Sequence, residues 1–210
     1  MSQGVFMKRT YQSQNRKLQA QETKNKILLA IKKLLNSKSY NEITIPQIAT
    51  AAGVSTPTIY ALYKSKAGVL KALLDSATET NDFAQFVIKT KSAVTLEEKL
   101  AQASHMTTQI YAAEKEMVSA LKGLAGLSEE LNRLEQEQEE RRYSRQEDTV
   151  KLLLKHNNVS SDLNLKQARD LFWTFTSRDF YRLLVIERGW TPTEFEQFLR
   201  QFLLFVFQKS

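Results

Sequence analysis

Apolar side chains recur at intervals of three and four residues through most of this chain, the spacing of one buried helix face. We expect helices near residues 22–37, 66–77, 95–112, 128–156, 165–188 and 191–208, and a further one that ends near residue 124. Only 6 Gly and 3 Pro interrupt the 210 residues, too few for the many tight turns of a β fold. The pattern therefore predicts an all-α protein.

Polar residues mark where two of these helices begin. Thr95 and Glu98 have the spacing of a capping box, as do Thr191 and Glu194, because each pair can satisfy free N–H groups at a helix start. Gly189 suits the C-terminal cap of the helix over 165–188, since glycine accepts positive φ without strain. We expect helix boundaries at these positions.

The apolar pattern also suggests three parts of the chain. Residues 1–20 have no helical apolar period and carry Lys8, Arg9, Arg16 and Lys17 among polar residues, which predicts a flexible basic arm. A small helical domain follows over 21–80. Residues 81–94 again lack a period and precede a larger helical domain, so that we place the second domain at 81–210.

The net charge of +7 is unevenly distributed. Residues 1–74 hold 12 Lys and Arg against two acids, whereas residues 75–210 hold 18 against 21. This asymmetry indicates that the N-terminal part meets a polyanion such as DNA. A solvated basic surface without a partner would show the same charge balance.

Two short helices near residues 44–63 carry the functional signal. Thr44 is a good N-cap, and Pro46 lies in the first turn, where its missing N–H costs nothing. Ala49 is small, as a close helix crossing requires, and Gly53 permits a sharp turn that Val54 fills. The first short helix and its turn have the pattern of a helix-turn-helix.

The second short helix begins at Ser55, a good N-cap, with Pro57 in its first turn. Ile59 and Tyr63 lie one turn apart and point back at the first helix. The outward side at its N-terminal end would enter the major groove of DNA. An ordinary helical hairpin is the alternative interpretation.

Residues 53–66 (GVSTPTIYALYKSK) and 67–74 (AGVLKALL) resemble the DNA-binding domain of the tetracycline-repressor (TetR) family, and the resemblance covers about residues 22–80. A weaker resemblance includes 168–173 (ARDLFW), 181–185 (YRLLV) and 187–190 (ERGW). The family resemblance implies an all-α homodimer of about nine helices, with an N-terminal three-helix helix-turn-helix domain and a C-terminal domain for ligand binding and dimerisation. Most members are repressors that a small ligand releases from operator DNA.

The resemblance also implies which residues touch DNA. Ser55 caps the recognition helix, Thr56 and Pro57 would meet base edges, and the phosphate contacts would come from Thr44, Thr58, Tyr60 and Lys66, with Gln47 and Lys64 as additions. Leu62 departs from the His or Tyr usual in the family. None of the recognition positions holds Arg, Asn or Gln, so DNA shape or the basic arm in the minor groove would supplement direct readout; a disordered tail is the alternative for the arm.

The last two helices carry more apolar residues than one buried face needs, which a dimer interface would explain. A thick core within one subunit is the alternative. The interface candidates are Phe180, Leu184, Phe195, Phe198, Leu199, Phe202, Leu203 and Val206. On the last helix, Leu204, Phe205 and Phe207 lie off the expected apolar stripe.

A ligand cavity is expected among the helices between residues 95 and 188. The candidates that face inward are Met106, Gln109, Ile110, Met117, Leu121, Phe172, Phe175 and Thr176, each of which could instead be plain core. The identity of the ligand cannot be inferred from these residues.

Enzyme interpretations find little support. The chain has no Cys, and His105 and His156 have no metal-binding or nucleophilic neighbour. Four acids between residues 135 and 140 lie beside three arginines, typical of a solvated, ion-paired helix face. We therefore expect no catalytic residue, no metal site and no cofactor. Without an apolar leader or a long apolar run, we expect a cytoplasmic protein.

These features predict a dimeric DNA-binding regulator that acts as a repressor. Ligand binding would move the helix over 66–80 and change the separation of the two recognition helices. An activator, a ligand-independent regulator, and a ligand carrier whose DNA-binding domain has degenerated are the alternatives.

Overall fold

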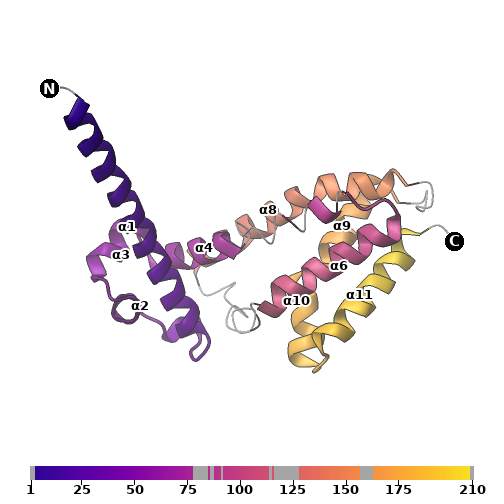
Figure 1. Ribbon diagram of the computed structural model, residues 1–210. Helices are drawn as coiled ribbons and strands as arrows, with labels where there is room; N and C mark the ends of the chain where they lie inside the picture. The colour runs from indigo at the N-terminus through magenta and orange to yellow at the C-terminus, as the bar shows by residue number, and fades with distance from the viewer. Residues whose placement is uncertain are drawn as a thin grey trace. The chain divides into compact units, whose positions relative to one another are not determined.

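The computed structural model describes residues 3–77, 85, 88–90, 92–113, 115, 128–156 and 163–208. The chain divides into two compact units, residues 1–75 and 76–210. Within the described residues the structure consists of helices and connecting loops, without a β-strand (Figure 1). The predicted all-α fold is confirmed.

The N-terminal unit is a small bundle built around α1 (Gln3–Leu35) and α2 (Ile45–Ala52). A 3-10 turn, η1 (Tyr40–Glu42), joins them, and α3 (Thr56–Tyr63) and α4 (Lys66–Ala77) follow. Its core consists of the buried apolar residues Ile27, Ala30, Ile31, Leu35, Tyr40, Ile43, Ile45, Ile48, Ala49, Ala52, Ile59, Ala67, Val69, Leu70 and Leu73. This core fixes α2 against α1 and α3 against α2.

The segment expected as a flexible arm is helical instead. Residues 3–20 continue α1 without a break to its end at Leu35. Residues 16–20 are exposed, in keeping with the missing apolar period there. Extending an existing helix avoids the cost of nucleation, and Gln, Lys, Arg and Ala are good helix formers. A segment can therefore be helical without an apolar face.

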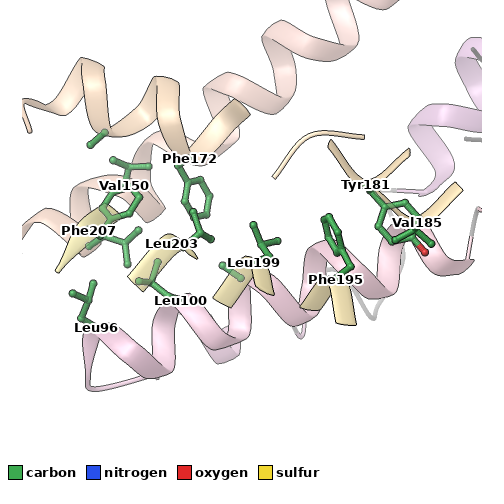
Figure 2. Packing of buried hydrophobic residues seen from close by; sticks show 13 residues of the cluster. Leu96, Leu100, Val150, Phe172, Tyr181, Val185, Phe195, Leu199, Leu203 and Phe207 are labelled. Atoms are coloured by element: carbon green, nitrogen blue, oxygen red, sulfur yellow. The ribbon is translucent and has the colours of Figure 1, made fainter. Parts of the chain in front are cut away.

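The C-terminal unit is a layered helical bundle. Its described helices are α6 (Leu96–Ala113), α8 (Glu129–Leu154), α9 (Leu165–Phe175), α10 (Arg178–Tyr181), the π-helical turn η2 (Arg182–Glu187) and α11 (Pro192–Phe207). α11 packs along α6, and α8 packs along α9. Figure 2 shows Leu100 of α6 beside Leu203 of α11, in a core that Phe172, Tyr181 and Phe195 extend.

Both predicted capping boxes are present. The backbone N–H of Thr95 donates to the Glu98 carboxylate at 3.0 Å, and the N–H of Glu98 donates to Thr95 Oγ1 at 3.1 Å. The pair at Thr191 and Glu194 repeats this arrangement at 2.7 and 3.2 Å. Gly189 has φ +77°, in keeping with the expected turn. The helix expected to end near residue 124 lies outside the described residues.

The single helix expected over 165–188 is broken. Thr176 turns its hydroxyl back to the carbonyl of Phe172 at 2.6 Å, and Ser177 caps a new helix by accepting the N–H of Phe180 at 3.1 Å. Such hydroxyl bonds compete with helix continuation. Beyond the break the chain forms a wide turn, in which the N–H of Arg188 donates to the carbonyl of Leu183, five residues earlier, at 3.2 Å. Apolar spacing alone does not reveal either event.

The buried stripe of α11 also differs from the expected one. Phe195, Leu199, Leu203 and Phe207 are fully buried, at intervals of four residues. Phe207, expected off the stripe, meets the ring of Phe172 edge-on with centroids 6.3 Å apart. The buried row of α11 is thus one edge of the predicted stripe, extended to Phe207, whereas the stripe's other members, Phe198, Phe202 and Val206, retain accessible surface.

Candidate DNA interface and effector site

α2 begins with a reciprocal cap. Thr44 Oγ1 accepts the N–H of Gln47 at 3.4 Å, and Gln47 Oε1 accepts the N–H of Thr44 at 3.1 Å. The predicted N-cap is therefore completed by Gln47, which was expected only as a DNA contact. Thr44 is exposed and Gln47 half-buried, so both remain at the surface where α2 starts.

The turn between α2 and α3 follows the predicted geometry. Gly53 has φ +65° and ψ +35°, the left-handed conformation, and the N–H of Val54 donates to the carbonyl of Ala49 at 3.0 Å. This bond closes a glycine C-cap of the Schellman type. The turn sets the angle at which α3 leaves α2.

Ser55 caps α3 and holds the hydroxyl of Thr58. Ser55 Oγ accepts the N–H of Thr58 at 3.3 Å, and the two hydroxyl oxygens lie 2.7 Å apart. If Ser55 donates its hydroxyl proton to Thr58, the hydroxyl of Thr58 keeps its own proton for an outside acceptor. The pair can therefore present one donor at the N-terminal end of α3.

The outer face of α3 is free for contact. Ile59 is fully buried against the domain, whereas the side chain of Tyr60 is 49% exposed and Pro57 is exposed. Thr56 and Thr58 are half-buried. α3 thus presents the residues expected to meet DNA, and its N-terminal amides favour anions.

Lys66 is placed differently from the expectation that its ammonium holds a phosphate. Its Nζ donates to the backbone carbonyls of Tyr40 and Ile43, both at 2.8 Å, and lies 4.1 Å from the centre of the Tyr40 ring. Burial lowers the pKa of this ammonium. Because its charge is engaged inside the domain, Lys66 connects the start of α4 to η1.

Lys64 closes α3 in an unusual conformation. It has φ +68° and ψ −40°, and the N–H of Ser65 donates across it to the carbonyl of Tyr63 at 2.8 Å. This is a strained γ-turn, and positive φ is costly for any residue with a Cβ. The recognition helix and α4 are therefore joined by a connection under backbone strain.

Gly68 meets a positional requirement that was not anticipated from the sequence. A Cβ at this position would lie 1.9 Å from the carbonyl oxygen of Tyr63. The start of α4 approaches the end of α3 so closely that only glycine fits. The signal available in the sequence was a lone glycine inside a helical pattern, which indicates close backbone approach.

The C-terminal unit gathers polar groups at the end of α9. The hydroxyl of Tyr111 donates to the carbonyl of Thr176 at 3.3 Å, and the amide of Gln146 donates to Thr176 Oγ1 at 2.9 Å. Arg142 donates to the carbonyl of Trp173 at 2.8 Å while it pairs with Glu139 at 2.7 Å. Arg142 thereby caps the carbonyl end of α9.

Three buried polar atoms nearby have no hydrogen-bond partner among the described residues: Gln146 Oε1, Trp173 Nε1 and Tyr181 Oη. Burial raises the pKa of the Tyr181 hydroxyl, whose ring lies 5.6 Å from that of Tyr111 and 5.0 Å from that of Phe195. An unsatisfied buried polar group costs about 1–3 kcal/mol. Groups left in this state are candidates for pairing with a ligand.

The expected ligand residues fall into three groups. Phe172 and Thr176 are buried, and Met106, Ile110 and Phe175 are half-buried, all within the C-terminal unit. Gln109 is exposed. Met117 and Leu121 lie outside the described residues. Tyr181, Gln146 and Trp173 were not anticipated, because their lack of partners emerges only from packing.

The expected dimer residues also need correction. Phe195, Leu199 and Leu203 are fully buried within one chain, so they belong to the core and cannot meet a second subunit. Phe180, Leu184, Phe198, Phe202 and Val206 retain accessible surface. Phe198 stacks on Phe202 with centroids 5.7 Å apart, and Leu183 of η2 is 45% exposed. The apolar surface that remains is a partly exposed aromatic face.

Within the described part of the chain, no group of three or more His, Cys, Asp or Glu is placed to hold a metal ion. None of the helices described is both long and apolar enough to cross a membrane.

Comparison with known proteins agrees with this architecture. Residues 27–73 match the model of a family described as bacterial regulatory proteins, tetR family. A 56-residue stretch is 38% identical to the HTH-type transcriptional regulator EthR of Mycolicibacterium smegmatis, over 27% of this chain and 26% of that protein. The matched segment thus spans about a quarter of this curated relative.

Solved structures extend the likeness to both units. The fatty acid degradation regulator FadR from Bacillus halodurans has a TM-score of 0.74 at 20% identity, over 87% of this chain and 94% of its own. NalD of Pseudomonas aeruginosa, the secondary repressor of the MexAB-OprM efflux pump, has 0.72 at 17%, over 91% and 98%. FadR from Bacillus subtilis, in complex with stearoyl-CoA, has 0.72 at 16%, over 86% and 97%. At these identities the likeness concerns the fold.

Proposed function

We propose that the chain is a member of the tetR family of bacterial regulatory proteins, whose model matches residues 27–73, and that it is a homodimeric repressor that a small-molecule effector releases from operator DNA. The observation that carries the proposal is the capped helix-turn-helix, in which α3 is buried through Ile59 and exposed through Pro57 and Tyr60. A recognition helix needs this division between a fixed face and a reading face.

The proposed DNA contacts are the surface residues at the starts of α2 and α3. Thr56 and Pro57 would touch base edges, while Thr44, Thr58 and Tyr60 would hold phosphates; Gln47 and Lys64 would add to them. The Ser55–Thr58 hydroxyl pair would donate its remaining proton to a phosphate oxygen. Lys66 would act indirectly, because its ammonium is engaged in fixing α4. Its contribution would be to hold the N-terminus of α4 near the DNA backbone.

The proposed dimer forms through the aromatic face of α10, η2 and α11. Exposed apolar residues such as Leu183 and Phe198 gain stability when a second copy covers them. A symmetric dimer would present two recognition helices to half-sites about one helical turn apart. Dimerisation therefore supports the proposed operator binding.

The proposed effector binds in the C-terminal unit. The unpaired polar atoms of Tyr181, Gln146 and Trp173 support this, because a guest that supplied hydrogen bonds there would gain their full value in an apolar surrounding. A protein of similar fold is described in complex with stearoyl-CoA. Effector binding would then shift α4 and the separation of the recognition helices, which would lower operator affinity.

The testing experiment selects bound fragments from the source genome at about 150 mM salt, where non-specific phosphate binding is suppressed. A recovered palindrome with half-sites about one helical turn apart would support a dimeric operator reader. The palindrome is then used to screen metabolites for release. Failure to enrich any sequence over random fragments would contradict the proposal and favour a ligand carrier, whereas an operator that no metabolite releases would favour a ligand-independent regulator.

A further inference from the structure

α1 is much longer than the domain it supports. Its 33 residues correspond to a length of about 50 Å, and from Arg16 onward, where side-chain burial is described, the first buried residue is Ile27. Residues 16–26 are exposed except for a half-buried Thr23. Figure 1 shows the N-terminal half of this helix, in dark indigo, projecting beyond α2 and α3.

The projecting half of α1 is basic along one line. Lys17, Lys24 and Ile31 are spaced by seven residues, close to two helical turns, so that they lie above one another. Ile31 is fully buried in the domain core. The basic line is therefore a continuation of the helix face that packs against α2, beyond the edge of the domain. Arg16 lies about 100° round the helix from Lys17 and is eleven residues, about three turns, from Ile27, which is also fully buried; it therefore extends a neighbouring row of the same buried face. Glu22 is the acid between residues 3 and 26.

A helix of this kind is poorly stabilised in isolation. A polar helix that buries no apolar face has little to offset its conformational entropy. A partner of opposite charge, bound along the basic line, would supply the stabilisation that packing does not. Since residues 1–74 carry an excess of ten positive charges, the partner that fits is a polyanion.

The geometry excludes one way of binding DNA and favours another. An α-helix with side chains is about 10–12 Å wide, whereas the minor groove is about 6 Å wide. The helical segment therefore does not fit the minor groove, the place expected for a flexible arm. Residues 3–24 would extend about 33 Å, close to one turn of B-DNA.

We propose that the projecting part of α1 is a second DNA surface, whose basic line lies on the phosphate backbone that flanks the half-site under α3. The inference rests on the proposed DNA binding and adds a partner surface outside the helix-turn-helix. Arg16, Lys17 and Lys24 each contact a phosphate. These contacts add affinity on every sequence and leave the preference among sequences unchanged.

The test uses the full-length protein with Arg16→Gln, Lys17→Gln and Lys24→Gln combined. Affinity is measured between about 50 and 300 mM salt, on the selected operator and on a random duplex. The matched control combines Lys26→Gln, Lys32→Gln and Lys33→Gln, which removes equal charge from other faces of the same helix. A second control, Arg16→Lys with Lys17→Arg and Lys24→Arg, keeps the charge.

The first triple variant is expected to lower the slope of log affinity against log salt by about five units on both duplexes, because it removes three phosphate contacts from each protomer of the dimer and each contact contributes about 0.9. This corresponds to a loss of about ten-thousand-fold at 150 mM salt. The two control variants should retain the native slope, and the ratio between operator and random duplex should stay constant.

The outcomes separate this inference from the proposed function. An unchanged slope on both duplexes, or an equal loss in the matched control, would overturn the inference while operator preference could persist. A lowered slope on random DNA in a protein without any preferred sequence would support the inference and contradict the proposed function. Binding to neither duplex would contradict both.

Discussion

Lys64 is the one described residue other than glycine with positive φ, and it is also a proposed DNA contact. Lys64→Gly should relieve the strain of the γ-turn and raise the free energy of unfolding by about 1 kcal/mol. The same change removes an ammonium and should weaken DNA binding. Denaturant unfolding and DNA titration measure the two effects. Lys64→Ala is the control, because it removes the charge without relieving the strain; equal stability of the Gly and Ala variants would contradict the argument.

Gly68 allows no side chain. Gly68→Ala places a Cβ 1.9 Å from a backbone oxygen and should destabilise the N-terminal unit by about 3 kcal/mol, since α4 must shift. The comparison is Gly53→Ala, which meets no atom within 4 Å but retains φ +65° and should cost about 1 kcal/mol. Thermal unfolding followed by circular dichroism gives both values. Equal losses would show that the close approach is not what selects glycine at residue 68.

The buried hydroxyl of Tyr181 should affect stability and effector response in opposite directions. Tyr181→Phe removes an unpaired polar atom and should stabilise the protein by about 1 kcal/mol. It should also raise the effector concentration needed for DNA release, if the hydroxyl pairs with the effector. Unfolding and release curves are measured on the same preparation. A more stable variant with unaltered release would remove Tyr181 from the effector site.

At the scale of elements, two helices depend on carboxylates at their starts. Hydrogen bonds from the backbone N–H groups of Thr95 and Val94 lower the pKa of Glu98, and a bond from the N–H of Thr191 lowers that of Glu194. Because each folded pKa lies below its ordinary value of 4.5, the stabilisation is complete above that pH and is lost as pH falls through the folded pKa.

Glu98→Gln combined with Glu194→Gln keeps an oxygen acceptor but removes the titration. The stability of this variant should therefore fall less than that of the native chain between about pH 6 and pH 3. Chemical unfolding at each pH provides the comparison, with Glu140→Gln, on the exposed side of α8, as the control. An identical pH dependence in variant and native chain would mean that the caps do not govern acid stability.

The elements also show what could be predicted from sequence. Local signals sufficed where a few neighbouring residues determine the structure: the cap of Ser55, the turn at Gly53 and both capping boxes. The break at Thr176 was missed because a threonine inside an apolar pattern breaks a helix only when its surroundings favour the alternative hydrogen bond. The helix over residues 3–20 was missed because apolar periodicity reports burial rather than helicity.

The candidate site residues show the same difference between features set by neighbouring residues and features set by distant ones. The exposed face of α3 could be predicted, since helix caps and apolar spacing fix which side is buried. The internal position of Lys66 could not, because its carbonyl partners at Tyr40 and Ile43 are more than twenty residues away. The assignment of Phe195 and Leu199 to a dimer interface failed because apolar character does not distinguish a core from an interface.

At the scale of the whole molecule, the aromatic face on η2 and α11 should determine the oligomeric state. Leu183→Glu combined with Phe198→Glu places two charges on side chains that are 45% and 36% exposed, and should convert a dimer into a monomer because an interface cannot bury them unpaired. Sedimentation equilibrium measures the mass. Leu29→Glu, at a 67% exposed position on α1, is the control that should leave the mass unchanged. A double variant that stays dimeric would place the interface elsewhere.

The π turn over Arg182–Glu187 affects how the C-terminal unit tolerates changes in chain length. Its hydrogen bonds reach back five residues where those of an α-helix reach back four, so the turn accommodates surplus backbone. Deletion of one residue here would leave enough chain for an ordinary α-helical turn, whereas the same deletion within α11 would rotate all later side chains by about 100°. This turn is therefore where the C-terminal unit can best absorb a one-residue deletion during its divergence.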